Sequence, residues 1–455
     1  MYKTLLILVC SFCVIQAFSQ QDSLLKKFKY RINNYQAINF NIGAASQLNR
    51  LPVVAGAVTN SSSYGSFGGG YYSIKSTDRI LLTTTAYLNT AFQSDRYNNP
   101  NNVNKSNYLS VAPQVSILNK WFSKNKFTEL GASIFSNTNS SKNTAQNIPG
   151  LAKYYQGQYS FAINTGIGKG RLENITDMQN ALWLSKALQT ANSLSRPLTA
   201  TELNELGRSI TTANNTRVLD ARKRTLFILE TVDNYLQQKG LINKTDIRYF
   251  SNLNDILFFA FNSQRLSGTE KYIRFTPGIN LYGTNQSQNY DSTKFKHRLN
   301  NKSLLLSTGI NKYTPQNLIH QNNYGASLKL SYNNFDITDK GFTRGVITTD
   351  TKANSNFKQA TVNLFYEHAI YPNTRTSINF NLQTQGGYQD IDKETSFFGS
   401  VSLVGTLNYF ISYRTRLTGS LSTAYQKNVY SIGQYLNYLP DNLLLYASAG
   451  VNISL

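Results

Sequence analysis

Segments in which every second residue is apolar constrain the fold of this chain more than any other feature of its sequence. Along residues 80 to 92, Ile80, Leu82, Leu88 and Phe92 share one face of an extended chain, and residues 155 to 167 repeat the pattern. Successive side chains of a strand point to opposite sides, so a period of two predicts strands. Both segments reach the roughly 9 to 11 residues that a strand needs to cross a bilayer.

The C-terminal half contains more segments of this kind. They cover residues 362–370, 378–382, 401–411 and 324–332, the last with Tyr324 and Tyr332 at its ends. The 30 Tyr and 25 Phe, against only 2 Trp, favour strands, because aromatic side chains fit a pleated, half-buried surface. Aromatic ends are also typical of strands in membrane barrels, where such rings sit at the depth of the headgroups.

The chain ends in its most regular alternating segment. One face of this segment is apolar throughout, while the other becomes steadily more polar toward the end. A closing strand of this kind resembles the outer-membrane β-barrel proteins of Gram-negative bacteria, although its last residue is leucine where that class more often has phenylalanine. The resemblance implies that the apolar residues of this strand face lipid; they include Leu443, Leu445, Val451, Ile453 and Leu455.

The number of alternating segments predicts the size of the sheet. About six precede residue 168 and about eight follow residue 269, so we expect a transmembrane antiparallel β-barrel of about 14 strands, within a range of 12 to 18. Its two parts are residues 20–167 and 269–455. The alternative is a soluble β-sandwich, whose strands of about 5 to 6 residues are shorter than these segments.

Residues 1–19 are expected to be a cleaved secretory signal peptide. A positively charged start is followed by an apolar run from Leu5 to Ile15 and by a small-residue cleavage site. The two cysteines of the chain, Cys10 and Cys13, lie in this run. The mature chain therefore has no disulfide, no thiol nucleophile and no cysteine metal site. We find no later apolar run of the roughly 18 residues that a membrane-spanning helix needs.

Residues 168–268 change from a period of two to helical spacing. Met178, Leu182 and Leu188 share a helix face, Thr199 to Glu202 predicts a capping box, and a third helix is expected from about residue 216 to 239. Barrels place both chain ends in the periplasm, so six preceding strands return the chain to that side. We therefore expect a small α-helical insertion on the periplasmic side.

Three glycines stand where the strand pattern gives way to the helical pattern. Gly166, Gly168 and Gly170 follow each other at alternate positions. The spacing differs from the G-x-G-x-x-G of dinucleotide-binding turns, and the surrounding pattern contains no parallel strand–helix–strand unit. Since glycine allows the backbone angles of sharp turns, we expect these residues to form a hinge through which the chain leaves the barrel.

The net charge of +22 predicts anionic partners. The insertion accounts for +4 of this charge, so most of the excess belongs to the barrel and its loops. It can serve adhesion to outer-membrane lipid and lipopolysaccharide, or selection of an anionic solute or acidic polysaccharide in the lumen. Nucleic acid is not an expected partner of an exported barrel.

A basic cluster lies at the expected start of the third helix. Arg217, Arg222, Lys223 and Arg224 surround Asp220. Such a cluster forms salt bridges between helices, lies on a solvated face, or binds a periplasmic protein partner. We retain it as the candidate partner-binding residues of the insertion.

The sequence offers little for catalysis. His297, His320 and His368 are the three histidines, and none has a metal-ligand spacing to another. An outer-membrane hydrolase with Asp291 or Ser292 beside His297 is the one enzymatic alternative. We expect no enzyme, no cofactor and no bound metal.

Two functions fit these expectations. The first is a pore or export channel that prefers anionic solutes or polymers, with the helical insertion gating it or docking a periplasmic partner. The second is a closed barrel that acts as a scaffold and recruits periplasmic or cell-wall partners. Sequence alone does not separate them, because a barrel of about 14 strands can be open or plugged.

Overall fold

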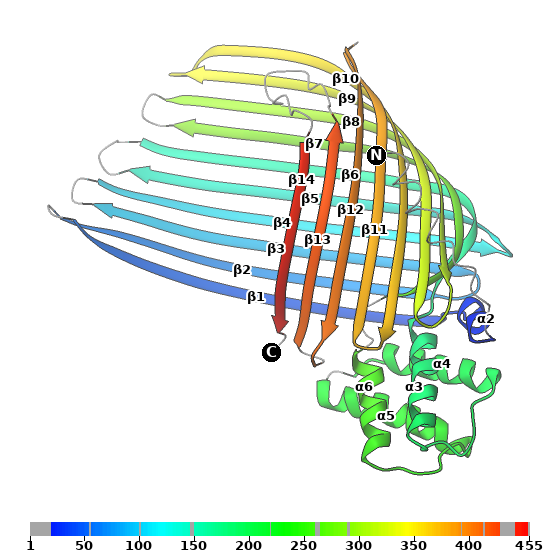
Figure 1. Ribbon diagram of the computed structural model, residues 1–455. Coiled ribbons are helices and arrows are strands. Elements are labelled where there is room, and N and C mark those ends of the chain that lie inside the picture. Colours follow the sequence, from blue (N-terminus) through cyan, green and yellow to red (C-terminus); the bar gives the residue numbers. More distant parts are fainter. Residues whose placement is uncertain are drawn as a thin grey trace.

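The computed structural model describes residues 20–453 except 54–55, 100–101, 146–149, 219, 260–263, 289–291, 393, 413–414 and 428–441. The expected signal peptide, residues 1–19, lies outside the described residues, and so do Asp291 and Leu455. The described chain folds into one large sheet with a block of helices at one end (Figure 1). We call this end the lower end of the sheet.

In the described part of the chain, fourteen strands form a single antiparallel sheet in the order of the sequence, which confirms the all-β fold class and the strand number predicted. Their lengths range from 12 residues in β14 to 28 in β10, well above those of ordinary soluble strands. The strands are β1 (Ile32–Val53), β2 (Gly56–Ser76), β3 (Ile80–Asn99), β4 (Asn102–Ser123), β5 (Lys126–Ala145), β6 (Gly150–Asn174), β7 (Leu266–Gln288), β8 (Thr293–Pro315), β9 (His320–Thr343), β10 (Val346–Asn373), β11 (Thr376–Ile391), β12 (Glu394–Phe410), β13 (Thr415–Lys427) and β14 (Asn442–Ile453).

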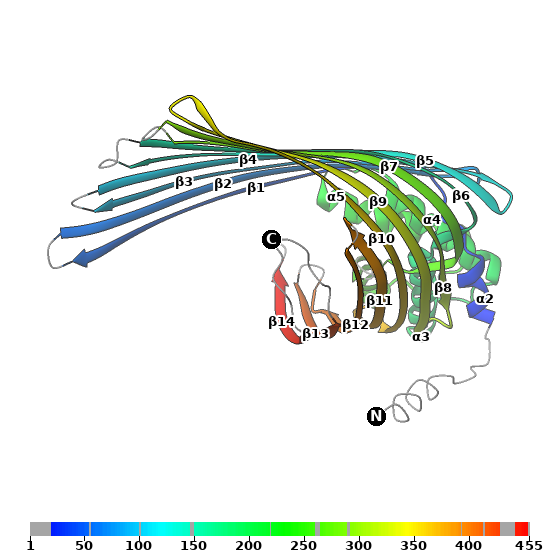
Figure 2. The same cartoon turned by 90° about the horizontal axis from the view of Figure 1, so that it is seen from above.

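The sheet curves strongly toward its C-terminal half. Viewed from above, β1 to β5 form a broad, gently bent part, and β11 to β14 turn back beneath it (Figure 2). Among the described residues β1 pairs with β2 alone and β14 with β13 alone. The two edge strands therefore stand apart, with the enclosed space open along one side.

Tight turns connect several strands. Arg344 and Gly345, between β9 and β10, both have positive φ angles, of 50° and 84°. Two such residues form the two-residue hairpin turn whose twist matches that of the flanking strands. Turns of this kind keep the register of long antiparallel strands fixed.

The helices are α2 (Gln20–Lys27), α3 (Thr176–Thr190), α4 (Ala200–Asn215), α5 (Ala221–Gln238) and α6 (Ile247–Phe259). The capping box predicted at Thr199 and Glu202 is present and opens α4. Asp220 caps α5 by accepting hydrogen bonds from the amides of Arg222 and Lys223. The third helix therefore begins five residues later than expected, and the fourth helix of the insertion, α6, has no counterpart among the helices we expected.

The helices share one hydrophobic core, which Leu318 from the turn between β8 and β9 also enters. Met178 and Leu184 of α3, Ile210 of α4 and Leu236 of α5 are all fully buried in it. Leu25, from the N-terminal helix α2, is buried in the same core. The first residues after the expected signal peptide thus fold with the insertion, although the two are about 150 residues apart in the sequence.

The boundaries of the insertion differ from those predicted. Strand β6 continues to Asn174 and β7 begins at Leu266, so the helical segment starts after residue 174 rather than at residue 168. The last residues of β6 pair with the first of β7, as Arg171 does with Thr269. Charged residues such as Arg171 and Glu173 interrupt the apolar alternation at the end of β6. Glu173 is compensated by Arg31, which is distant in the sequence.

The three glycines are not a hinge. All three lie inside β6: Gly166 and Gly168 pair with residues of both β5 and β7, and Gly170 pairs with Glu270 of β7. A side chain at Gly168 would come within 2.3 Å of the Phe127 ring, and one at Gly170, where φ is +92°, within 1.9 Å of the Thr269 carbonyl oxygen. Close approach inside the sheet, and not an exit from it, explains why these positions hold glycine.

Candidate functional site

One face of the sheet is apolar and exposed. A single row of paired residues crosses seven strands of this face, and its apolar members Trp121, Ile167, Ile273, Leu328 and Val362 are each more than a third exposed. The same face carries Leu443, Leu445 and Val451 of β14, and Ile453 pairs with Thr415 in the same register. We call it the outer face.

The opposite face is polar. It carries mainly Asn, Gln, Ser and Thr, and β11 and β12 show the pattern clearly, with Asn379, Asn381 and Gln383 opposite Thr406, Val404 and Ser402. We call this the inner face. Apolar and polar faces of one sheet follow directly from the period of two in the sequence.

Charge is distributed unequally between the two faces. Basic residues accumulate on the outer face, with few acidic residues such as Asp336 and Asp350 among them. On the inner face basic and acidic residues nearly balance; they are Lys120, Arg274, Lys329 and Arg416 against Asp95, Glu129, Glu270, Asp339 and Glu367. The basic residues of the outer face include Lys75, Arg96, Lys105, Lys126, Lys142, Lys153, Lys169, Lys271, Lys294, Lys296, Arg298, Lys302, Lys312, Lys340, Lys352 and Lys358.

Four charged side chains form a cluster on the inner face near the lower end. Lys120 Nζ lies 2.8 Å from Glu270 Oε2 and 3.7 Å from Glu129 Oε2. Arg274 binds both carboxylates, with its Nη2 atom 3.0 Å from Glu270 Oε1. Lys120, Glu129 and Glu270 are each less than a tenth exposed, so this pairing is required, because an unpaired charge at such a position is very costly.

The cluster also identifies the inside of the curve. Lys120 is on β4 and Glu270 on β7, with two strands between them. Neighbouring strands are about 4.8 Å apart, so the two side chains meet because this face is concave. The inner face therefore lines the space that the sheet encloses.

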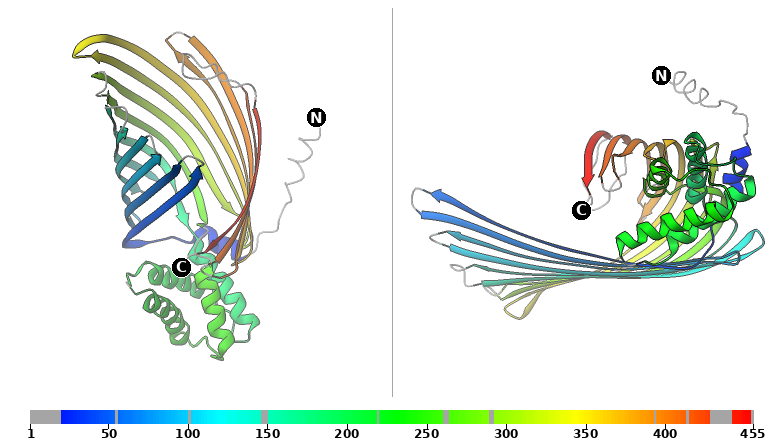
Figure 3. Two further views of the ribbon diagram at one scale, coloured as in Figure 1. Left: turned by 90° about the vertical axis from the view of Figure 1, so that its left-hand side faces the viewer. Right: turned by 90° about the horizontal axis from the view of Figure 1, so that it is seen from below.

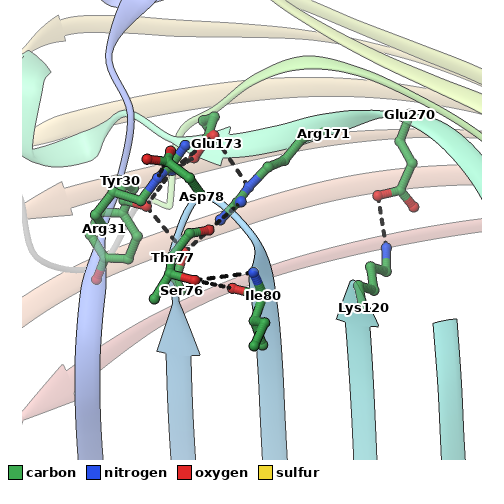
Figure 4. A network of polar contacts seen from close by, with 10 residues as sticks. All are labelled: Tyr30, Arg31, Ser76, Thr77, Asp78, Ile80, Lys120, Arg171, Glu173 and Glu270. Carbon is green, nitrogen blue, oxygen red and sulfur yellow. Dashed lines mark hydrogen bonds and ion pairs between the residues drawn. The ribbon is translucent and has the colours of Figure 1, made fainter. Parts of the chain in front are cut away.

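A second charged network joins the start of β1 to the end of β6 (Figure 4). Arg31 contacts Asp78 and Glu173, each at 2.8 Å, and Arg171 contacts Glu173 at 3.2 Å. Arg171 also donates a hydrogen bond to the Ser76 hydroxyl at 2.8 Å. These contacts fix the point where the chain leaves the sheet for the helices.

Two further contacts fasten the helices to the lower end of the sheet. Arg265, just before β7, is completely buried and donates hydrogen bonds to the Leu318 carbonyl at 2.8 Å and to Gln321 Oε1 at 2.7 Å. Asp255 of α6 pairs with Arg375 in the turn between β10 and β11. Seen from below, the helical block lies within the curve of the sheet (Figure 3). It therefore stands beside the lower opening of the enclosed space.

The candidate partner-binding residues are brought together at the start of α5. Arg217, Arg222 and Lys223 are exposed, whereas Arg224 is half-buried. Arg222 and the exposed Leu226 are one turn apart and so share a face of the helix. Among the described residues, Arg217, Arg222 and Lys223 form no ion pair with another helix, so inter-helix bridging does not account for them.

Each of the three histidines lies beside another titratable side chain. His297 Nδ1 lies 2.5 Å from Asp339 Oδ1 on the inner face, and His320 Nδ1 lies 3.4 Å from His368 Nε2 on the outer face. Ser292 sits in the turn before β8 and has no hydrogen bond to His297 in the described part of the chain. No group of three or more His, Cys, Asp or Glu suited to a metal ion occurs among the described residues.

None of the described helices combines the length and the apolar character needed to cross a membrane. No model of a known protein family matches the chain, and neither does any curated protein. Comparison with solved structures does find matches, with identities of 6% to 10% for the three given below.

Three of these structures illustrate the likeness. The ferric yersiniabactin uptake receptor FyuA from Yersinia pestis aligns with a TM-score of 0.37 and 6% identity over 87% of this chain, which spans 54% of the receptor. The translocator domain of the autotransporter NalP from Neisseria meningitidis aligns with a TM-score of 0.28 and 8% identity, over 83% of this chain and 89% of the domain. The toluene transporter TbuX from Ralstonia pickettii aligns with a TM-score of 0.29 and 10% identity, over 92% of this chain and 96% of the transporter.

Proposed function

We propose that this protein is an outer-membrane β-barrel that forms a channel for polar solutes. One observation carries the proposal: side chains alternate along the fourteen described strands, so that the sheet has an exposed apolar face and a concave polar face. A bilayer accepts strands only when lipid covers the apolar side and the backbone groups pair within the sheet. The polar side then lines an aqueous path.

Pairing of β1 with β14 would complete the barrel. With an even number of strands, the first and last run in opposite directions and can form an antiparallel pair like the other thirteen. Both edge strands carry highly exposed apolar residues, including Ile42 at 82% and Leu445 at 75%. Closure would satisfy both edges at once, and an unpaired edge is not tolerated in lipid.

We propose uncharged polar solutes as the main cargo. The inner face is rich in amides and hydroxyls and nearly balanced in charge, whereas the lysines that give the chain its net charge lie on the outer face. Lysines on a lipid-facing surface serve adhesion to lipid phosphates, including lipopolysaccharide, rather than selection in the lumen. The preference for anionic solutes expected from net charge is therefore our second choice.

The helical block would serve the channel at its periplasmic mouth. We propose that it restricts the opening and that the surface formed by Arg217, Arg222, Lys223 and Leu226 docks an acidic segment of a periplasmic protein. Exposed apolar groups beside basic ones support this, because protein interfaces combine an apolar centre with charges that select the partner. A scaffold without conduction is the alternative.

Planar-bilayer recording tests the channel. Purified full-length protein should give discrete conductance steps, and a salt gradient should give a reversal potential close to zero, because the charged groups of the inner face balance. A strongly anion-selective potential would restore the preference expected from net charge. Absence of conductance from protein that shows heat-modifiable gel mobility would favour the closed scaffold instead.

A further inference from the structure

Three lysines on the outer face occupy directly adjacent positions near the lower end of the sheet. Lys126 of β5 pairs with Lys169 of β6, which pairs with Lys271 of β7. All three are exposed, and none forms an ion pair with a carboxylate in the described part of the chain. We call these residues the lysine row.

The arrangement is unfavourable without an anion. Residues directly opposite each other on adjacent strands are about 5 Å apart, and like charges at such positions destabilise a sheet. The row continues with Ser123 on one side and Ile310 on the other, so its next positions supply no carboxylate. A negatively charged ligand would replace this repulsion by three favourable contacts.

An apolar groove lies directly above the lysine row. The next outward-facing row contains Trp121, Ile167, Ile273 and Leu328, and these residues line a cavity of about 1080 Å³ together with the three lysines. The cavity thus has an apolar wall along the strands and positive charge at its lower end. Trp121 stands near this charged end, at the depth where tryptophan gathers at membrane interfaces.

We propose that the lysine row and the groove bind one anionic phospholipid of the inner leaflet. The lysines would hold the phosphate and the acidic headgroup, since each ammonium group offers three hydrogen-bond donors. An acyl chain would lie along the groove. The inference rests on the proposed function, because it requires the outer face to contact lipid with the helices on the periplasmic side.

Quenching of Trp121 fluorescence by brominated lipid tests this inference. The chain has 2 Trp, so the Trp183→Phe variant leaves Trp121, inside the groove, as the single reporter. The variant is reconstituted with brominated phosphatidylglycerol or brominated phosphatidylcholine at equal mole fractions. We expect phosphatidylglycerol to reach half-maximal quenching at about a tenfold lower mole fraction, as three lysines near a lipid surface allow. A parallel series with Trp121→Phe, in which Trp183 remains, supplies the signal to subtract should Trp183→Phe fold poorly.

Charge removal gives the decisive comparison. Replacing Lys126, Lys169 and Lys271 together by Gln should abolish the preference for phosphatidylglycerol while leaving quenching by phosphatidylcholine intact. The matched control replaces Lys142, Lys153 and Lys294 by Gln; these residues lie on the same face at the upper ends of their strands. This control should keep the preference.

The outcomes separate the two proposals. Equal quenching by the two lipids in the parent protein, or a preference that survives loss of the lysine row, overturns the lipid site and leaves the membrane barrel intact. If neither lipid quenches Trp121, the outer face does not contact lipid, and the proposed function fails with the site.

Discussion

For single residues, the reason why a side chain occupies its position often lies with a neighbour that is distant in the sequence. Gly168 is glycine because the Phe127 ring and the Lys271 carbonyl occupy the space of a side chain. Arg265 is charged and completely buried because carbonyl oxygens of the turn between β8 and β9 surround it. Neither reason can be read from a local pattern.

Asp177 in α3 gives a prediction at this scale. Burial raises the pKa of its carboxyl group to about 6, although the Thr211 hydroxyl and the Asn214 amide both donate hydrogen bonds to it. The protonated form is favoured in the folded helices, so its stabilising contribution is complete below about pH 4 and lost as the pH rises through 6. The loss amounts to roughly 3 kcal/mol at about 1.4 kcal/mol for each pKa unit.

The Asp177→Asn variant checks this directly. We expect the helical block of the variant to unfold with nearly constant stability between pH 4 and 7, while that of the parent weakens. Denaturant unfolding monitored by Trp183, in a Trp121→Phe background, reports on the helices. Parallel pH profiles for the two proteins would show that Asp177 does not titrate in this range.

At the scale of the element, alternation makes neighbouring residues of one strand face different environments. In β9, Leu330 lies on the outer face within the apolar band, whereas Ser331 lies on the inner face. The proposed function therefore assigns the first residue to lipid and the second to the aqueous interior.

Arginine at these two positions distinguishes the faces. Leu330→Arg should lower the free energy of unfolding in vesicles by about 2 to 4 kcal/mol, as for a charge placed near the bilayer midplane. Ser331→Arg, one residue away, should change it by less than about 1 kcal/mol, because water can solvate the charge. Equal effects in denaturant titrations would argue against a lipid-facing outer surface.

In the molecule as a whole, the helical block is joined to the lower end of the sheet by two polar contacts and one apolar residue. The Asp255–Arg375 pair ties α6 to the turn between β10 and β11, and Arg265 ties the start of β7 to the next turn along the sheet. The hydrophobic core of the helices meets the sheet at Leu318, in the turn between β8 and β9.

The ion pair between Asp255 and Arg375 tests whether the block restricts the channel. Asp255→Arg places two positive charges together and should detach α6 from the sheet, raising the variance of single-channel current relative to the parent protein. Adding Arg375→Asp reverses the pair and should return the current to its original pattern. Indistinguishable recordings from all three proteins would mean that the block does not control conduction.

Residue patterns alone are enough to predict the strands, their number and the existence of a helical insertion. Periodicity is a local property, because it depends on where successive side chains of one segment point. The face of each lysine was also readable in principle, since Lys169 has the same parity as Ile167 in β6. Odd and even positions along each strand are therefore the signal from which the lysines could have been predicted to lie on the outer face and not in the lumen.

The ends of β6 and β7, the pairing of charged side chains and the position of the helices become visible only in the folded chain. Glu129 and Arg274 are 145 residues apart, and Tyr30 and Asn215 are 185 apart. Such contacts depend on strand register and on the curvature of the sheet, which arise from the pairing of the whole chain. The periodicity of a short segment cannot predict these contacts, because each partner taken alone is an ordinary polar residue on a strand or helix.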